Sequence, residues 1–174
     1  DRTTDEKIEW LDKCMTFVCD KHGDPVVKFH GFGVTSVRIL LEYPWYSVDS
    51  ASWVMFSRYG TVLVPKVDAN GQWKYDTAPM SVQITLRAPT IQKKGYQHYN
   101  SMNRHAQEII RKYIYEKGFV LGRSLMKDGN EIIVHSGVCN DHRMRDLLNL
   151  QFYIDLGKHI QPWPWRYKFK DFVF

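Results

Sequence analysis

Apolar residues recur at helical spacing in four parts of the chain, with shorter apolar runs between them. In the first part, Ile8, Leu11, Met15 and Val18 form one face of an expected helix that Thr4 or Asp5 can cap. The same spacing predicts helices over 5–22, 34–42, 101–117 and 141–156. Runs rich in β-branched and aromatic residues predict strands over 26–29, 46–53, 60–65, 73–75, 82–86, 119–121 and 132–135. Helices alternating with short strands indicate an α/β fold.

The segment 28–65 gives the clearest order of elements. A strand ending at Phe29 is followed by a Gly turn, by a helix that Pro44 ends, and by a second strand over 46–53. Such a strand–helix–strand unit is typical of parallel sheets, whose strand carboxyl ends carry the chemistry. Asp49 lies inside the second strand, where an unpaired carboxylate is costly to bury. Asp49 is therefore the first candidate functional residue.

Two roles are open to Asp49. As a structural residue it caps a turn or pairs with Arg58. As a catalytic residue it is a carboxylate kept ionised by hydrogen bonds from Ser47, Ser50 or Ser52. Such a carboxylate can act as a nucleophile toward an electrophilic sugar carbon.

His30, Gly31 and Gly33 form the turn before the second helix. Two glycines allow the backbone to approach a flat ligand closely, although an ordinary loop between strand and helix has the same composition. His30 is either a base or a histidine packed in the core. The turn is a candidate ligand-binding segment.

Composition narrows the choice of partner and compartment. The chain has 174 residues and a formal net charge of +5, a mild basic excess that favours nucleic acid only weakly. Three cysteines cannot form a disulfide framework, which fits a reducing compartment. The chain has no membrane-spanning apolar run and no signal-peptide pattern, so we expect a cytoplasmic location, in the host cytoplasm for a viral protein. A first residue other than Met suggests a processed or truncated piece.

Two further patterns, a possible metal site and the aromatic-basic tail, indicate a function less clearly than the segment 28–65 does. Cys139, His142 and His135 do not have the paired spacing of a structural zinc site, so no metal is expected. Aromatic and basic residues alternate over 163–170, which suits either base stacking with phosphate contacts or a strap packed on the core. We favour the strap.

The segment HGFGVTSVRILLEYPWYSVDSASWVMFSRYGTVLVP, residues 30–65, resembles the late barrel segment of the tRNA-guanine transglycosylase superfamily. The archaeosine branch and phage-encoded relatives that place 7-deazaguanines into DNA have the most similar pattern. In it, a His-x-Phe-Gly turn precedes a helix, and a later strand carries Asp-Ser-Ala, an aromatic residue and a basic-Gly run. The matching residues are His30, Phe32, Gly33, Asp49, Ser50, Ala51, Trp53, Arg58 and Gly60.

The resemblance implies a TIM-barrel transferase that exchanges guanine in DNA or tRNA for a 7-deazaguanine, as in queuosine and archaeosine chemistry. It implies that Asp49 attacks the anomeric carbon and forms a covalent glycosyl-enzyme, with retention as in a retaining glycosidase. It also implies a substrate-binding role for His30, Gly31, Phe32, Gly33 and Ser50. Arg58 is expected to contact phosphate.

Three departures from the family pattern shape the expected fold. The family's zinc motif is absent, and Leu148 stands near the place of its distant histidine. Nothing here matches the family's N-terminal half, and a complete barrel needs about 200 residues or more. We therefore expect a partial TIM-barrel-like α/β fold: 1–64 ends the barrel, and 65–174 adds a small β insertion and a helical C-terminal extension. The chain is then a fragment, a diverged remnant, or one subunit of a split enzyme in which a second chain supplies the N-terminal half-barrel.

Two other functions remain open. One is a non-catalytic nucleic-acid-binding or scaffold subunit that keeps the motif as part of its core. The other is a basic nucleic-acid-binding module that uses the tail, for which binding depends strongly on salt.

Overall fold

The chain divides after Ser50 and again after Lys158. The described parts of 1–50 and 159–174 form the first unit, and residues 51–158 the second. The structure is a computed structural model that describes residues 3–87 and 97–170. Pro89 and the last four residues of the tail lie outside the described residues.

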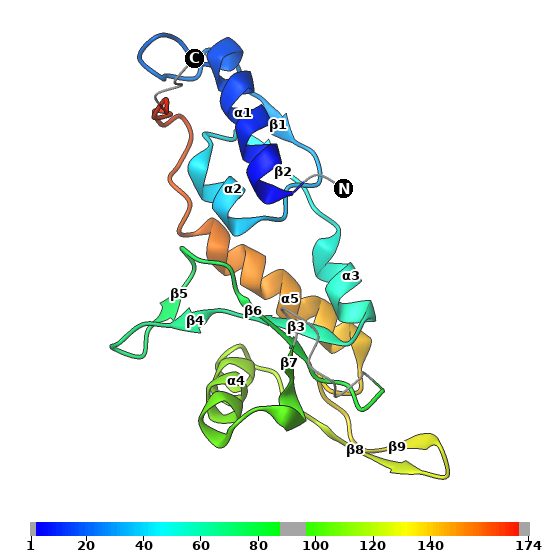
Figure 1. The fold of residues 1–174 in the computed structure, drawn as a ribbon. Coiled ribbons are helices and arrows are strands. Elements are labelled where there is room, and N and C mark those ends of the chain that lie inside the picture. The colour runs from blue at the N-terminus through cyan, green and yellow to red at the C-terminus, as the bar shows by residue number, and fades with distance from the viewer. Residues whose placement is uncertain (1–2, 88–96, 171–174) are drawn as a thin grey trace. The chain divides into compact units, whose positions relative to one another are not determined.

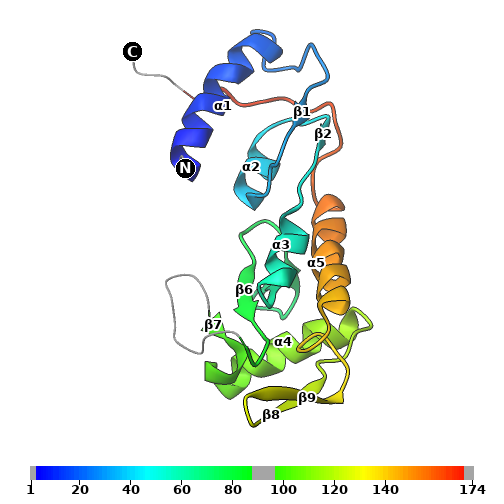
Figure 2. The ribbon, with the colours of Figure 1, turned by 90° about the vertical axis from the view of Figure 1, so that its right-hand side faces the viewer.

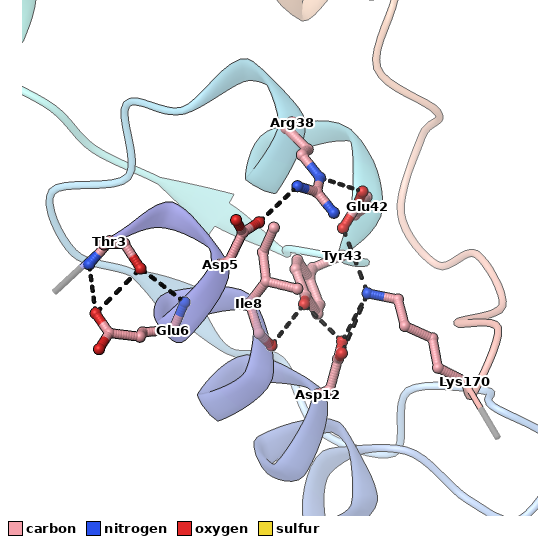
Figure 3. Close-up of polar contacts among 9 residues, drawn as sticks. All are labelled: Thr3, Asp5, Glu6, Ile8, Asp12, Arg38, Glu42, Tyr43 and Lys170. Atoms are coloured by element: carbon pink, nitrogen blue, oxygen red, sulfur yellow. Dashed lines mark hydrogen bonds and ion pairs between the residues drawn. The ribbon is translucent and has the colours of Figure 1, made fainter. Parts of the chain in front are cut away.

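Helix α1 (Thr4–Val18) opens the first unit and confirms the predicted apolar face, since Ile8, Leu11 and Met15 are buried. The cap is Thr3, one residue before the prediction. Its hydroxyl accepts from the Glu6 amide, and the Glu6 carboxylate accepts from the Thr3 amide at 2.6 Å (Figure 3). This capping box fixes where the helix begins.

The predicted parallel strand–helix–strand unit is confirmed, with different bounds. It consists of β1 (His30–Gly31), α2 (Val37–Glu42) and β2 (Ser47–Val48), and the two strands pair in parallel (Figure 1). The prediction of a strand over 26–29 is wrong. Val26 and Val27 are exposed, so their apolar side chains are not buried in the core. The strand predicted over 46–53 is too long, since the chain turns after Val48 and starts a helix at Ser52.

The tail packs onto the first unit as a strap, as predicted. The Tyr167 ring stacks on Tyr43 with centroids 5.6 Å apart, and its hydroxyl donates to Asp12 at 2.6 Å. Lys170 reaches the same carboxylate at 3.1 Å and also pairs with Glu42 (Figure 3). The aromatic residues of the tail thus serve packing within this unit.

The second unit contains three sheets and three α-helices among its described residues. In chain order its elements are α3 (Ser52–Arg58), β3 (Thr61–Val64), β4 (Lys66–Val67), β5 (Trp73–Lys74), β6 (Met80–Gln83), β7 (Gln97–His98), the 3-10 helix η1 (Tyr99–Ser101), α4 (Arg104–Glu116), β8 (Arg123–Lys127), β9 (Asn130–His135) and α5 (His142–Gly157). The sheets are β3-β6-β7, β4-β5 and β8-β9.

The core of the second unit lies between the β3-β6-β7 sheet and its helices. Val62 and Val82 are paired across β3 and β6 and pack with Ile110 and Ile114 of α4 and with Leu148 of α5. Helix α5 also contacts α3 and β3 (Figure 2).

Two details of the second unit correct the sequence analysis. Within the helix predicted over 141–156, the apolar Leu147 does not face the core: it is 55% exposed, and its neighbour Leu148 is buried. No strand forms over 119–121 as expected. The chain enters a strand only at Arg123, where β8 of the β8–β9 hairpin begins. This hairpin projects outward from the unit in Figure 1.

The observed class is mixed helix and strand, in agreement with the α/β prediction at that level. The largest sheet among the described residues has three strands, and no closed barrel is formed there. The strands are two to six residues long, because turns and polar residues interrupt each apolar run. Among the same residues, no helix combines the length and the apolar character needed to cross a bilayer.

Candidate functional site

Asp49 lies at the carboxyl end of the parallel pair β1–β2, not inside a strand as predicted. It directly follows Val48, and its amide donates to the Gly31 carbonyl at 3.1 Å. Its Oδ1 accepts a hydrogen bond from the Gly33 amide at 2.8 Å, and its Oδ2 lies 3.8 Å from His30 Nε2. About half of the side chain is exposed, so water and ligands can reach the carboxylate. Strand carboxyl ends are where parallel sheets place reactive groups.

His30 is not a core histidine, since 39% of its side chain is exposed. Its Nδ1 lies 2.9 Å from Ser47 Oγ, which links the first residues of the two paired strands. Its ring also meets the edge of the Phe32 ring, with centroids 5.1 Å apart. Ser47 and Phe32 therefore orient the imidazole beside the Asp49 carboxylate.

The two glycines of the turn have different roles. A Cβ on Gly31 would lie 2.7 Å from a Val34 methyl and 3.0 Å from the Trp45 ring, so Gly31 permits tight packing. Gly33 has φ +64°, a left-handed conformation that glycine adopts without strain. That conformation directs the Gly33 amide to Asp49.

A pocket of about 530 Å³ lies beside this cluster within the first unit. His30 and Gly33, which both contact Asp49, line it together with Trp10, Cys14, Phe29 and Trp45. Its volume falls in the range of small-molecule sites, and aromatic walls suit a flat ligand. The contribution of α1 was missed, since Trp10 and Cys14 are far from the turn in sequence and only the packing of α1 brings them there.

The other predicted binding residues are placed as follows. Phe32 is 86% exposed, and Ser50 follows Asp49 as the last residue of its segment of the first unit. Arg58 ends α3 and belongs to the second unit. There it lines a different, polar pocket of about 570 Å³, which also contains Arg87 and Arg145.

Metal-ligating side chains are not gathered in the described part of the chain. No group of three or more His, Cys, Asp or Glu residues there could hold an ion. Burial raises the pKa of the Cys14 and Cys139 thiols, which favours their protonated form. Leu148, near the expected place of the family's zinc histidine, is fully buried in the core.

No protein-family model matches the chain, and no curated protein or solved structure is significantly similar to it.

Proposed function

We propose that the first unit carries the nucleophile of a base-exchange transglycosylase, which replaces guanine in a polynucleotide with a 7-deazaguanine. The observation that carries the proposal is the exposed Asp49 carboxylate at the carboxyl end of β1–β2. One of its oxygens is fixed by the Gly33 amide, and the other faces His30. A carboxylate held in one orientation and reachable from solvent is suited to nucleophilic attack.

The reaction consists of two displacements. Asp49 Oδ2 attacks the anomeric carbon, the bond to guanine breaks with its electron pair on the base, and an imidazolium at His30 protonates that base. The ring nitrogen of the incoming 7-deazaguanine then bonds to the same carbon, its proton returns to His30, and the carboxylate leaves. Histidine is the side chain best suited to carry a proton both ways near neutral pH. Two inversions at one carbon give net retention.

The pocket next to His30 is the proposed site of the base. Its aromatic side chains can stack on a purine, and its 530 Å³ exceed what a single base needs. The β1–α2–β2 unit is proposed as one parallel unit of a (β/α) barrel, completed by a second chain that supplies the remaining strands. The proposal includes no metal cofactor.

A second candidate function is a scaffold or nucleic-acid-binding subunit that keeps the motif without the reaction. The bond from the Gly33 amide to Asp49 favours it, because the same contact can simply fix the turn between β1 and α2. The two functions differ in whether Asp49 forms a covalent bond.

Covalent trapping distinguishes them. The chain is incubated with guanine-containing DNA and, separately, with tRNA, alone and with a chain that completes the barrel, and adducts are resolved on a denaturing gel. We expect an adduct for the wild type and for Asp5→Asn, which changes an exposed carboxylate of the same unit, but not for Asp49→Asn. An adduct that persists in Asp49→Asn excludes Asp49 as the nucleophile. The absence of any wild-type adduct supports the scaffold.

A separate measurement tests the base pocket. Because Cys14 lines it, a bound 7-deazaguanine base is expected to slow alkylation of Cys14 by iodoacetamide, read as modified peptide by mass spectrometry. Cys139 lies in the second unit and serves as the internal control. Equal slowing of both thiols, or of neither, counts against base binding in this pocket.

A further inference from the structure

The second unit contains a pocket of about 570 Å³ whose walls carry three arginines. Arg58 comes from the end of α3, Arg87 follows β6, and Arg145 lies on α5. One carboxylate, Glu131 of β9, also lines it. The charged side chains therefore leave a formal charge of +2 around a polar space.

Arg145 is a buried cation without a counter-ion among residues 3–87 and 97–170. It is 6% exposed, and its Nε and Nη1 donate to the backbone carbonyls of Ser57 at 3.0 Å and Val138 at 2.8 Å. No described carboxylate lies within ion-pair distance of it; burial lowers its pKa, and the more distant charges of Asp141, Asp146 and Glu131 oppose that shift. A buried charge whose direct hydrogen bonds all go to neutral carbonyls gains from an anion in the adjoining space.

Arg58 and Arg87 differ in whether their guanidinium groups already have a partner within the protein. Arg87 Nε lies 3.3 Å from Glu131 Oε2, with 74% of the Arg87 side chain exposed. Arg58 is exposed and has no hydrogen bond or ion pair with any residue that the structure describes. The second Glu131 oxygen, Oε1, is buried and has no hydrogen-bond donor in the same part of the chain. An anion that carries a proton or a hydroxyl would satisfy both the arginines and this oxygen.

We propose that this pocket is a binding site for a phosphate group, with Arg58 and Arg87 as direct ligands and Arg145 as the buried positive charge behind them. Guanidinium groups bind phosphate oxygens through charge-assisted, often paired hydrogen bonds. A phosphate also offers several oxygens to cations on different walls, whereas a carboxylate offers two. The proposal concerns the second unit alone and does not depend on the reaction proposed for Asp49.

Cys139 reports on this pocket because it is part of the wall. The full chain is alkylated with iodoacetamide at rising inorganic phosphate, with chloride added to keep ionic strength constant, and each cysteine peptide is quantified. We expect phosphate to slow modification of Cys139 at least about threefold, with no change at Cys14 in the other unit. Equal rates with and without phosphate overturn the proposal.

Matched variants locate the phosphate. Calorimetry should give about tenfold weaker phosphate binding for Arg58→Gln and for Arg87→Gln, since each loses a charged hydrogen bond. Arg104→Gln is the control, because it removes the same charge from a side chain of the second unit that is 93% exposed and lies outside the pocket. Glu131→Gln should bind phosphate more tightly, because it removes the opposing charge. If Arg104→Gln weakens binding as much as Arg58→Gln, the effect is general electrostatics and the proposal fails.

Three phosphate forms then identify the source. A nucleoside monophosphate, a phosphodiester oligonucleotide and the nucleoside without phosphate are each tested for protection of Cys139. Protection by the monophosphate alone identifies a small phosphate ester, and stronger protection by the oligonucleotide identifies a nucleic-acid backbone. Protection by the bare nucleoside as strong as that by the monophosphate contradicts phosphate recognition. Circular dichroism of each variant confirms that it is folded.

Discussion

Two carboxylates of the first unit, Asp12 and Asp49, are used in opposite ways. Asp12 is 4% exposed and accepts hydrogen bonds from the Tyr43 hydroxyl and from Lys170 (Figure 3). It also accepts one from the Tyr167 hydroxyl. Asp49 is half exposed and has one backbone donor, Gly33, for one of its oxygens. The first carboxylate is enclosed by partners, and the second keeps a face open to a ligand.

The difference separates a structural acid from a candidate catalytic one. Burial alone raises the pKa of Asp12, but the three donors outweigh it and lower that pKa below 3.8, so the group stays ionised in the folded protein. Asp12 lies on α1, and its donors come from Tyr43 at the end of α2 and from Tyr167 and Lys170 of the tail, so Asp12 joins distant segments. The Asp49 carboxylate joins the end of β2 to the nearby turn after β1, through Gly33 and His30. Loss of Asp12 should therefore weaken the fold, and loss of Asp49 should leave it intact.

The largest effect is expected for Asp12→Ala. It leaves the Tyr167 hydroxyl and Lys170 without their shared acceptor, and leaves the Tyr43 hydroxyl only the Ile8 carbonyl. It should lower the stability of the first unit by about 3 kcal/mol. Asp49→Ala should cost less than about 1 kcal/mol, because its partner is one amide next to solvent. Urea unfolding together with hydrogen exchange of the α1 peptides gives both values. Equal losses would remove the distinction between the two carboxylates.

Acid should reveal the corresponding carboxylate of the second unit, Asp155. Burial opposes its ionisation, but bonds from Lys117, Lys158 and Gln151 hold its pKa at about 2, below the ordinary 3.8. Its stabilisation is therefore complete above the ordinary pKa and is lost as pH falls through the folded value. The loss should amount to about 2 kcal/mol for this shift. Unfolding measured between pH 5 and pH 2 should show it in the wild type but not in Asp155→Asn; the same slope in both contradicts it.

Tyr167→Phe sharpens the comparison at the tail. The change keeps the ring stacked on Tyr43 but removes one donor to the ionised Asp12, at an expected cost of about 1.5 kcal/mol. Tyr115→Phe, at an exposed position on α4, is the control and should be neutral within about 0.5 kcal/mol. Thermal unfolding measures both. A neutral Tyr167→Phe would show that the strap is held by ring packing alone.

A smaller effect on stability than that of Tyr167→Phe is expected for Gly33→Ala. Its φ of +64° is unfavourable for alanine, at a cost of about 1 kcal/mol. Gly71→Ala is the matched control, because Gly71 has φ +77° and open space around its Cα as well. Both variants should lose similar stability, measured by urea unfolding, but only Gly33→Ala should reduce the adduct at Asp49. Equal adduct yields would mean that the Gly33 amide does not position the carboxylate.

Much of the local structure was readable from the sequence. The first helix, the parallel strand–helix–strand unit around the Gly turn and the last helix all follow from spacing and turn residues. Strand bounds were less accurate, because two-residue strands such as β1 are defined by pairing and not by composition. Asp49 and His30 were each named as candidates, but their approach to 3.8 Å was not predicted, and Ser47, expected to donate to Asp49, hydrogen-bonds His30 instead.

Asn149 shows what spacing cannot reveal. Its fully buried amide accepts from the Leu63 amide and donates to the carbonyls of Thr61 and Trp53, fastening α5 to β3 and α3. A polar residue inside a helix pattern gives no sign of such partners, which lie 86 to 96 positions away in the chain. Arg145 was missed for the same reason.

By itself, the sequence determined the short-range features: the start of α1 to within one residue, the Gly turn and the parallel unit. These depend on contacts within a few residues or on one turn of helix. The tertiary structure decided which carboxylate is enclosed and which is open, and which arginines share a pocket. Exposure and charge pairing depend on segments brought together from distant parts of the chain, such as the tail on Asp12, and local patterns do not encode that proximity.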